Sequence, residues 1–349
     1  MKVKITDGRY IGEGEPCFIV AEMSANHNQD YDKAVKIIKA ASTAGADAIK
    51  LQTYTPDTIT IDNQDSLFRI SEDSTWAGKN LYKLYEEAYT PWEWQPELKK
   101  IAEDLGLICF SSPFDKTAID FLEKMGVPMH KIASFELVDL PLIRYAAQKG
   151  KPLIMSTGMA TLYEIDDAVK AIEDVGNRQM VLLKCVSAYP ALPEEMNIRT
   201  IPDLKERFKC PVGLSDHTLG HEVALAAVTL GANVIEKHFT LSKKDGGPDS
   251  SFSMEPDDFT AMVKAIRLVE KALGKVSYEP TEKELISKQF RRSLFVVKDV
   301  KKGERLTMDN VRSIRPSAGL MPKYLDDIIG REASCNIKAG SPLKFDYIK

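Results

Sequence analysis

The sequence predicts an α/β fold: a (β/α)8 TIM barrel followed by a small C-terminal domain. Three observations support this fold class. Eight short apolar runs alternate with amphipathic, helix-length segments along most of the 349 residues. Polar residues follow each run, as they do at the carboxyl ends of barrel strands. No glycine-rich phosphate-binding fingerprint follows the first run, whereas an open doubly wound sheet normally has one there.

The apolar runs are rich in β-branched and aliphatic residues, which is typical of parallel strands buried on both faces. Each run has the length of a strand rather than of a helix. We therefore expect strands at residues 17–22, 47–52, 107–112, 130–134, 152–156, 180–185, 211–215 and 233–238.

Helices are expected between these strands, because apolar residues recur there at helical spacing. Several of the segments have proline or acidic residues near their first turn, which favour a helix N-terminus. The expected helices include residues 31–44, 91–105, 161–175, 219–231 and 256–273.

The barrel pattern ends near Gly274, so we expect a barrel domain at residues 1–274. Residues 275–289 are polar and contain Pro280, which indicates a linker. Residues 290–349 then form a small domain with a strand at 292–297 and a turn at 301–304. A domain of about 60 residues is only marginally stable alone, so we expect it to dock on another surface.

Composition narrows the functional classes. A net charge of −4 with mixed signs provides no field for a polyanion, which argues against a nucleic-acid partner. Five cysteines without a Cys-x-x-Cys pair indicate reduced thiols. The N-terminus lacks an apolar signal region, and no apolar stretch reaches membrane-spanning length. We therefore expect a cytoplasmic protein with no membrane partner.

Two histidines lie at the ends of neighbouring predicted strands. His217 follows the run at 211–215 and His238 ends the run at 233–238, and each has an acidic neighbour. Because parallel strands deliver their carboxyl ends to the same edge, we expect the two imidazoles to lie close together. The pair favours a divalent metal site with open positions, although a lone strand-end histidine is usually structural. His27 is expected near the site, whereas His130 and His221 are expected to be structural or surface residues.

The other predicted strands end in ammonium and hydroxyl donors. Such donors suit a small polyanion, with the ammonium groups providing charge and the hydroxyls fixing orientation. Phosphoenolpyruvate or a phosphosugar would fit, and a metal would separately polarise a carbonyl group. Glu22, Glu136 and Asp249 remain for proton transfer and for binding hydroxyls. The predicted anion-binding residues are Lys50, Lys131, Ser112, Ser134, Ser156 and Ser215.

Seven stretches along the barrel resemble the bacterial nonulosonic acid synthases. This family condenses phosphoenolpyruvate with a six-carbon N-acetylamino sugar to give a nine-carbon, sialic-type acid. Residues 298–304 and 312–316 resemble the antifreeze-like (SAF) domain that closes these enzymes. The barrel stretches are 21–27 (AEMSANH), 50–53 (KLQT), 111–114 (SSPF), 131–136 (KIASFE), 156–159 (STGM), 213–218 (GLSDHT) and 236–239 (EKHF).

The resemblance implies a role for each matching residue. His217 and His238 would bind Mn²⁺, with Mg²⁺ or Co²⁺ as alternatives, and Glu236 and Asp216 would support them. Glu22, Gln52 and Asp249 would face the amino sugar, and Glu136 would handle water or protons. Arg315 would reach the sugar from the small domain of a partner subunit, which implies a domain-swapped homodimer. The phosphate pocket would consist of Lys131, Ser134, Ser156, Tyr189 and Ser215, and the carboxylate pocket of Lys50 and Ser112.

Within the family, the chain departs from the N-acetylneuraminate branch. It has Ser24-Ala25-Asn26 where those enzymes usually have Gly-Ile-Asn, Phe135 in place of glycine, and Ser187 in place of asparagine. These departures resemble the pseudaminic acid synthases, whose sugar is a 6-deoxy-2,4-diacetamido-altrose. Phe135 would then lie beside the sugar or pack in the barrel mouth. The alternative substrates are those of N-acetylneuraminate and legionaminate synthases.

Two hypotheses from other functional classes remain. A Schiff-base aldolase would use Lys131 or Lys184 as its amine, but it would leave the histidine pair without a role. The other hypothesis is that the antifreeze-like domain is an ice-binding module. The charged run at residues 298–305 argues against a flat, weakly polar ice-binding face.

Overall fold

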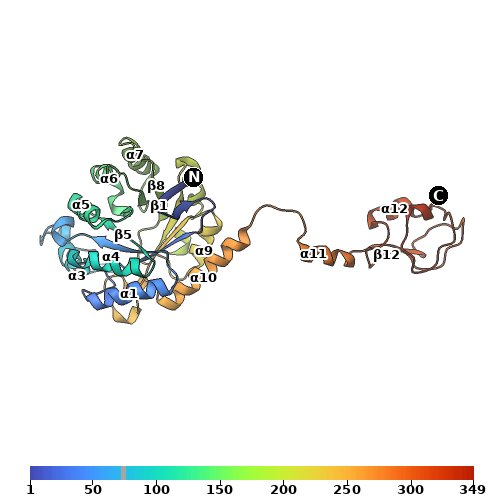
Figure 1. Cartoon of the computed structure of the whole chain (residues 1–349), viewed down its shortest axis with the longest axis horizontal. Helices are drawn as coiled ribbons and strands as arrows, with labels where there is room; N and C mark the ends of the chain where they lie inside the picture. Colours follow the sequence, from blue (N-terminus) through green and yellow to red (C-terminus); the bar gives the residue numbers. More distant parts are fainter. Residues whose placement is uncertain (72–75) are drawn as a thin grey trace. The chain divides into compact units, whose positions relative to one another are not determined.

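The computed structural model describes residues 1–71 and 76–349. The chain divides into two compact units, Met1–Gly274 and Lys275–Lys349 (Figure 1). Each unit has its own hydrophobic core. No helix of the described residues is long and apolar enough to cross a membrane.

The first unit is a closed parallel barrel, which confirms the predicted fold class. Each strand pairs in parallel with the next one along the chain, and β10 closes the ring by pairing with β3. Every expected strand is present, with ends that differ from the prediction by at most a few residues. The barrel strands are β3 (Phe18–Glu22), β4 (Ala48–Thr53), β5 (Ile108–Pro113), β6 (His130–Ile132), β7 (Leu153–Ser156), β8 (Met180–Cys185), β9 (Val212–Asp216) and β10 (Val234–His238).

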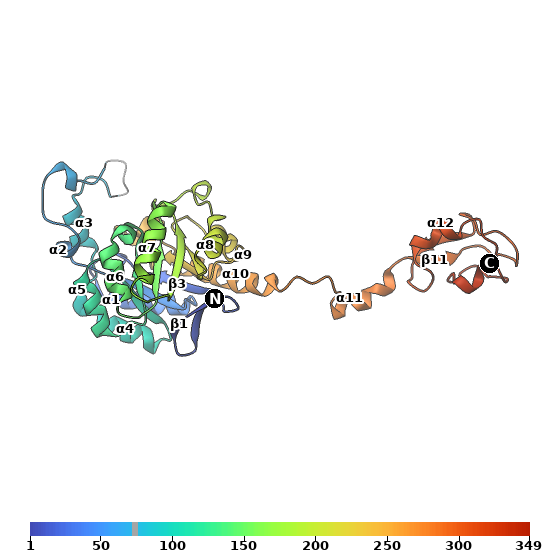
Figure 2. The same ribbon diagram turned by 90° about the horizontal axis from the view of Figure 1, so that it is seen from above.

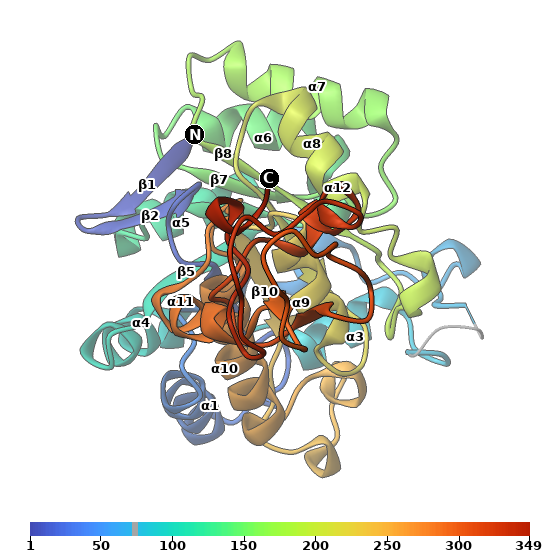
Figure 3. The same cartoon turned by 90° about the vertical axis from the view of Figure 1, so that its right-hand side faces the viewer.

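Helices surround the strands (Figures 1 and 3). Side-chain caps fix where several of them begin: Asp30 caps α1, and Thr161 forms a capping box with Glu164 at the start of α7. The helices of this unit are α1 (Tyr31–Thr43), α2 (Pro56–Ile59), α3 (Leu81–Ala88), α4 (Gln95–Asp104), α5 (Lys116–Met125), α6 (Leu140–Ala147), α7 (Leu162–Glu173), α8 (Thr200–Phe208), α9 (Glu222–Thr229) and α10 (Pro256–Leu273).

Two helices are shorter than predicted. The segment expected at 91–105 begins with a 3-10 turn at Trp92–Trp94, and the α-helix starts only at Gln95. The segment expected at 219–231 is helical only from Glu222, because residues 219–221 form a turn that contains Gly220 at φ +74°. Apolar periodicity runs into both turns, so the pattern overestimated the helix length.

An N-terminal hairpin covers the amino end of the barrel and was not predicted. Strands β1 (Lys2–Thr6) and β2 (Arg9–Gly12) pair in antiparallel fashion around Asp7 and Gly8, as Figures 2 and 3 show. Val3, Ile5 and Ile11 are buried in one cluster with the apolar residues of the barrel interior. The amino end is therefore filled with apolar side chains, which leaves the carboxyl end for chemistry.

The second unit is small, and its two strands pair in antiparallel fashion: β11 (Ser293–Val296) and β12 (Val311–Ile314). Its helices are α11 (Glu282–Ser287) and α12 (Leu325–Ile328). Part of the segment predicted as a linker is thus helical, because Thr281 and Glu284 form a capping box at the start of α11. The core of this unit consists of Leu294, Val296, Val300, Leu306, Val311, Ile328, Ala333, Ile337 and Leu343.

Candidate active site

One layer of buried, mostly polar residues crosses the barrel at its carboxyl end. Strand side chains alternate between the barrel interior and the surrounding helices, so residues two apart share a face. Val20, Phe110 and Val234 belong to the apolar interior, and the residue two positions further along each strand is polar. On each of the eight strands, the residue two positions beyond an interior position is buried. These residues are Glu22, Lys50, Ser112, Lys131, Ser156, Cys185, Ser215 and Glu236.

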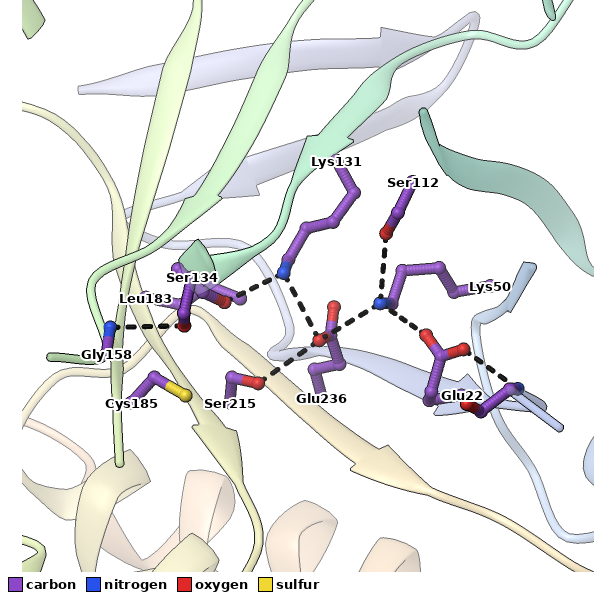
Figure 4. A network of polar contacts seen from close by, with 12 residues as sticks. Glu22, Lys50, Ser112, Lys131, Ser134, Gly158, Leu183, Cys185, Ser215 and Glu236 are labelled. Carbon is purple, nitrogen blue, oxygen red and sulfur yellow. Dashed lines mark hydrogen bonds and ion pairs between the residues drawn. The ribbon is translucent and has the colours of Figure 1, made fainter. Parts of the chain in front are cut away.

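Glu236 lies between the two lysines of this layer (Figure 4). Its Oε1 is 3.4 Å from Lys50 Nζ and 3.4 Å from Lys131 Nζ, and it accepts a hydrogen bond of 3.2 Å from Ser215 Oγ. Its Oε2 is buried without a hydrogen-bond partner among the described residues. A single carboxylate therefore holds two ammonium groups on either side of the site.

The remaining bonds of the lysines bring in three strand-end residues named from the sequence. Lys50 forms an ion pair with Glu22 and donates a hydrogen bond of 3.3 Å to Ser112 Oγ. Lys131 donates one of 2.8 Å to Ser156 Oγ. The predicted anion-binding residues are thus assembled around two positive charges, as an anionic ligand requires.

Burial and the neighbouring charges shift the pKa values in opposite directions. Burial raises the pKa of Glu22 to about 7, although the ammonium of Lys50 opposes the shift. Burial also lowers the pKa of Lys131, and its attraction to Glu236 only partly compensates. Burial acts to raise the pKa of Glu236, but Lys131 and Lys50 outweigh it and the pKa is lowered. Lys131 and Lys50 thus favour the charged form of Glu236, which lies between them.

Glu136 is a second carboxyl group that titrates near neutrality. It lies in the 3-10 turn η3 (Ser134–Val138) that follows β6, and its Oε2 is buried without a hydrogen-bond partner among the described residues. Burial raises its pKa to about 7. Its neighbour Phe135, in the same turn, is 58% exposed.

Ser134 and Gly158 form a cradle beside the lysines. The backbone N–H of Gly158 donates to Ser134 Oγ over 3.1 Å. A Cβ atom at position 158 would lie 2.3 Å from Ser187 Oγ and 2.7 Å from Ser134 Oγ. Only glycine allows both hydroxyls to approach the backbone here.

The two predicted metal-binding histidines lie together at the same rim. The ring centroids of His217 and His238 are 5.4 Å apart, and Tyr189 packs against His217 with a centroid separation of 4.3 Å. His217 Nδ1 is 2.8 Å from the Val186 carbonyl oxygen, so this nitrogen donates the hydrogen bond, and in the neutral ring the lone pair is on Nε2. The Nδ1 of His238 is buried without a hydrogen-bond partner among the described residues.

The donor set around these imidazoles is small. No group of three or more His, Cys, Asp or Glu residues that could hold a metal ion occurs within residues 1–71 and 76–349. Glu236 pairs with lysines rather than with an imidazole. Asp216 accepts from Lys237 Nζ over 2.8 Å and from Thr218 Oγ1 over 2.7 Å. Any metal held here would thus have two protein ligands and several open positions, a donor set that still suits a divalent ion.

Asp249 and Gln52 complete the set that was assigned to the sugar. Asp249 is buried in the loop after β10, where its Oδ2 accepts a hydrogen bond from Ser24 Oγ. Burial raises the pKa of Asp249. Gln52 lies two residues beyond Lys50 on β4, on the same face of the strand and nearer its end.

Three predicted residues lie outside this cluster. Arg315 belongs to the second unit, where it follows β12 and is exposed. His27 is fully buried, accepts from the backbone of Gln29 and bonds to Thr90 Oγ1 over 3.0 Å, so it supports the loop rather than the site. His130 is also buried and bonds to Glu123 over 2.8 Å, which agrees with the structural role expected for it.

Sequence reasoning missed the position of Cys185 and the central place of Glu236. Cys185 is buried at the end of β8, and its Sγ lies 4.0 Å from His217 Nδ1. Glu236 was assigned to support the histidines. Strand alternation was the available signal, because Glu236 and His238 are two residues apart on β10 and must point the same way.

Polar and charged side chains gathered at the carboxyl end of a TIM barrel are typical of barrel enzymes. The sequence model of the NeuB family matches residues 37–278, and that of the SAF domain matches residues 291–349. The chain belongs to the NeuB family.

Individual relatives cover nearly the whole chain. It is 47% identical to the pseudaminic acid synthase of Helicobacter pylori over 96% of this chain and 98% of that protein. It is also 47% identical to a pseudaminic acid synthase of Campylobacter jejuni, over 94% of this chain and 95% of that one. Among solved structures, the N-acetylneuraminic acid synthetase of Leptospira borgpetersenii matches with a TM-score of 0.74 and 31% identity, over 82% of this chain and 95% of that chain.

Proposed function

We propose that this chain condenses phosphoenolpyruvate with 2,4-diacetamido-2,4,6-trideoxy-altropyranose and water to give pseudaminic acid and inorganic phosphate. Relatives with 47% identity over nearly the full length carry the name pseudaminic acid synthase. The single structural observation that carries the proposal is the pair of buried ammonium groups, Lys50 and Lys131, on either side of Glu236. Phosphoenolpyruvate has a carboxylate and a phosphate a short distance apart, so it needs two cationic subsites.

The two subsites differ in their hydroxyl donors. On one side, Lys50 and Ser112 bind the carboxylate. On the other side, Lys131 and Ser156 bind the phosphate together with Ser134, Ser215 and Tyr189. The Lys50–Ser112 and Lys131–Ser156 hydrogen bonds support this division, because each lysine already lies beside the serine assigned to its pocket.

The reaction balances with the groups present. C3 of phosphoenolpyruvate attacks the aldehyde carbon of the open-chain sugar, and the aldehyde oxygen gains a proton to become a hydroxyl. Positive charge develops at C2, where water adds and loses a proton to a carboxylate. The C2–O bond to phosphate then breaks, and the new carbonyl forms at C2. Glu136 and Glu22 suit the proton transfers, because both have a pKa raised to about 7.

We further propose that His217 and His238 hold a divalent ion, with Mn²⁺ the expected metal. The free Nε2 lone pair of His217 and the unpartnered Nδ1 of His238 support this assignment. A bound ion would supply Lewis-acid polarisation of the sugar aldehyde. Removal of divalent ions with EDTA should abolish turnover, and adding Mn²⁺ should restore it. Isothermal titration of Mn²⁺ should detect one site in the wild type and none in a His217→Ala variant.

We also infer a cytoplasmic homodimer in which Arg315 of one subunit serves the barrel of the other. The exposure of Arg315 in its own unit supports a role outside that unit. The cytoplasmic location is supported by the cysteines, all five of which are free.

An isotope experiment tests the reaction itself. Phosphoenolpyruvate with ¹⁸O in the bridging C2–O–P position should release phosphate that contains the label, because the C–O bond breaks. Mass spectrometry of the phosphate and of the nine-carbon product records both results. Unlabelled phosphate, or a product mass without the three-carbon addition, would contradict the proposal.

A further inference from the structure

Ser24 has a backbone conformation that a serine rarely adopts. It lies two residues after the end of β3 and has φ +45°, in the left-handed region that favours glycine. It is only 2% exposed, so its hydroxyl group contacts protein rather than solvent. A strained, buried polar residue next to an active site indicates that its side chain has a task.

The structure gives Ser24 two hydrogen bonds, and both go to carboxylates of the site. Its backbone N–H donates to Glu22 Oε1 over 2.8 Å, and its Oγ donates to Asp249 Oδ2. Glu22 and Asp249 come from opposite ends of the barrel sequence. One residue therefore links the carboxyl group beside Lys50 to the carboxyl group in the loop after β10.

The side chains of Asn26 and Asn28 bind the same loop but touch no carboxylate, whereas the backbone of Ala25 is a second hydrogen-bond partner of Asp249. Asn26 Nδ2 donates to the Phe239 carbonyl over 3.0 Å and to Ser253 Oγ over 2.9 Å. Asn28 Nδ2 donates to the Gly246 carbonyl over 3.1 Å, and Asn28 also has a left-handed backbone, with φ +51°. Asn26 and Asn28 therefore already attach the loop after β10 to this segment. The hydrogen bond from Ser24 to Asp249 adds a contact to a carboxylate of the site.

We propose that Ser24 is a positioning residue that holds the Asp249 and Glu22 carboxylates in a fixed arrangement at the sugar end of the site. The proposal rests on the proposed function for the identity of the sugar, whereas the hydrogen bonds stand on the geometry alone. Fixing two carboxylates before the sugar binds lowers the cost of orienting its hydroxyl and acetamido groups.

Two substitutions of Ser24 separate the hydroxyl from the backbone. Ser24→Ala and Ser24→Gly both remove the bond to Asp249 and keep the N–H that binds Glu22. Ser24→Gly also relieves the left-handed strain, so it provides a folded variant if Ser24→Ala does not fold. Asn28→Ala is the matched control, because it weakens the attachment of the same loop without touching a carboxylate.

Steady-state kinetics give the first readout. For both Ser24 variants we expect kcat/KM for the amino sugar to fall about 10- to 100-fold, the range expected when a group moves by up to about an ångström. The KM for phosphoenolpyruvate should stay within about twofold, because the lysine pockets are unchanged. The Asn28→Ala variant should retain most of its kcat/KM. Equal losses in all three variants, or no loss in the Ser24 variants, would overturn the proposal.

A titration that needs no turnover keeps this test separate from the proposed function. The ¹³C carboxyl signal of Asp249, identified with an Asp249→Asn variant, reports its pKa in Mg²⁺-loaded protein. The hydroxyl of Ser24 favours the charged form, so its removal should raise this pKa, while Asn28→Ala should leave it unchanged. If wild-type protein turned over no sugar, the proposed function would fail, and this shift would still decide the role of Ser24.

Discussion

At the scale of single residues, four buried charged groups define the site. They are the ammonium groups of Lys50 and Lys131 and the carboxylates of Glu22 and Glu236, and they form ion pairs with one another. Lys50 and Lys131 are both buried, and each is offset by a carboxylate that is also buried. Burying a charge is costly unless it is paired, so the arrangement depends on every member. Glu236 is the member that serves both lysines.

Replacing Glu236 should therefore destabilise the fold as well as the site. Glu236→Gln leaves two buried ammonium groups without their shared counter-ion, and breaking a buried pair costs about 3–5 kcal/mol. Urea unfolding should detect the loss, and the double variant Glu236→Gln, Lys131→Met should recover part of it. Glu206 is an exposed glutamate on α8 and provides the control, since Glu206→Gln should change the free energy of unfolding by less than about 0.5 kcal/mol. A Glu236→Gln variant as stable as the control would contradict the shared-counter-ion interpretation.

Glu136 should make stability depend on pH in a defined window. Burial raises its pKa in the folded state from 4.5 to about 7, so the folded protein binds this proton more tightly than the unfolded chain does. Its contribution to stability is therefore present below about 4.5 and is lost as the pH rises towards 7. The Glu136→Gln variant lacks this loss, so its melting temperature relative to wild type should increase between pH 5 and pH 8. A difference that stayed constant, or that fell with pH, would show that Glu136 is not buried in its protonated form.

At the scale of elements, the barrel depends on alternation along each strand. The same two-residue period that fills the interior with apolar side chains places one site residue on every strand. Gly213 shows how tight the interior is, because a Cβ there would lie 2.4 Å from the Val234 carbonyl oxygen. The strands therefore supply both the core and most of the site. The loops and turns carry Asp249, Glu136 and Tyr189, which packs against His217.

The N-terminal hairpin should act as a stabilising cover that does not affect catalysis. Ile11 is fully buried against the barrel interior, whereas Tyr10, its neighbour on β2, is 36% exposed. Ile11→Ala should cost about 2–5 kcal/mol of stability, and Tyr10→Ala should cost much less. Thermal unfolding measures both. Because the hairpin lies at the amino end, KM values should be unchanged in either variant. A changed KM would show that the hairpin affects the site as well as stability.

These elements also show what sequence can predict. The barrel strands were predicted because each is a short apolar run with a polar end. The hairpin was overlooked although its signals are present: Val3 and Ile5 alternate with polar residues, and Asp7-Gly8 is a two-residue turn. The bonds of Glu236 and of Ser24 could not be predicted, because they join residues that only barrel closure brings together. For Ser24 and Asp249, 225 residues separate the partners in sequence.

At the scale of the whole molecule, we propose that one residue of the second unit, Arg315, serves the barrel of a partner subunit. Arg315 belongs to the unit Lys275–Lys349, and every other predicted site residue belongs to Met1–Gly274. The unit that carries Arg315 has nine buried core residues of its own, so it is a folded element that could present the arginine. The assignment of Arg315 to a partner subunit can be tested without knowing the complex.

Mixing two inactive variants should restore activity if Arg315 serves the other subunit. Arg315→Ala disables one half of the composite site and Lys131→Ala disables the other. A heterodimer of the two contains one site with both residues intact, so about half of the wild-type turnover per heterodimer is expected. Subunit exchange is followed by mass spectrometry of differently tagged chains. Proven exchange with no recovered activity would mean that the arginine serves its own barrel.

A comparison of kcat/KM for two sugars on the purified protein tests the proposed substrate. We expect a clear preference for 2,4-diacetamido-2,4,6-trideoxy-altropyranose over N-acetylmannosamine, with one phosphate released and one nine-carbon acid formed per turnover. Some use of N-acetylmannosamine is compatible with this result, provided that its kcat/KM is the lower of the two. A higher kcat/KM for N-acetylmannosamine would contradict the account and move the chain to the sialic acid branch of its family.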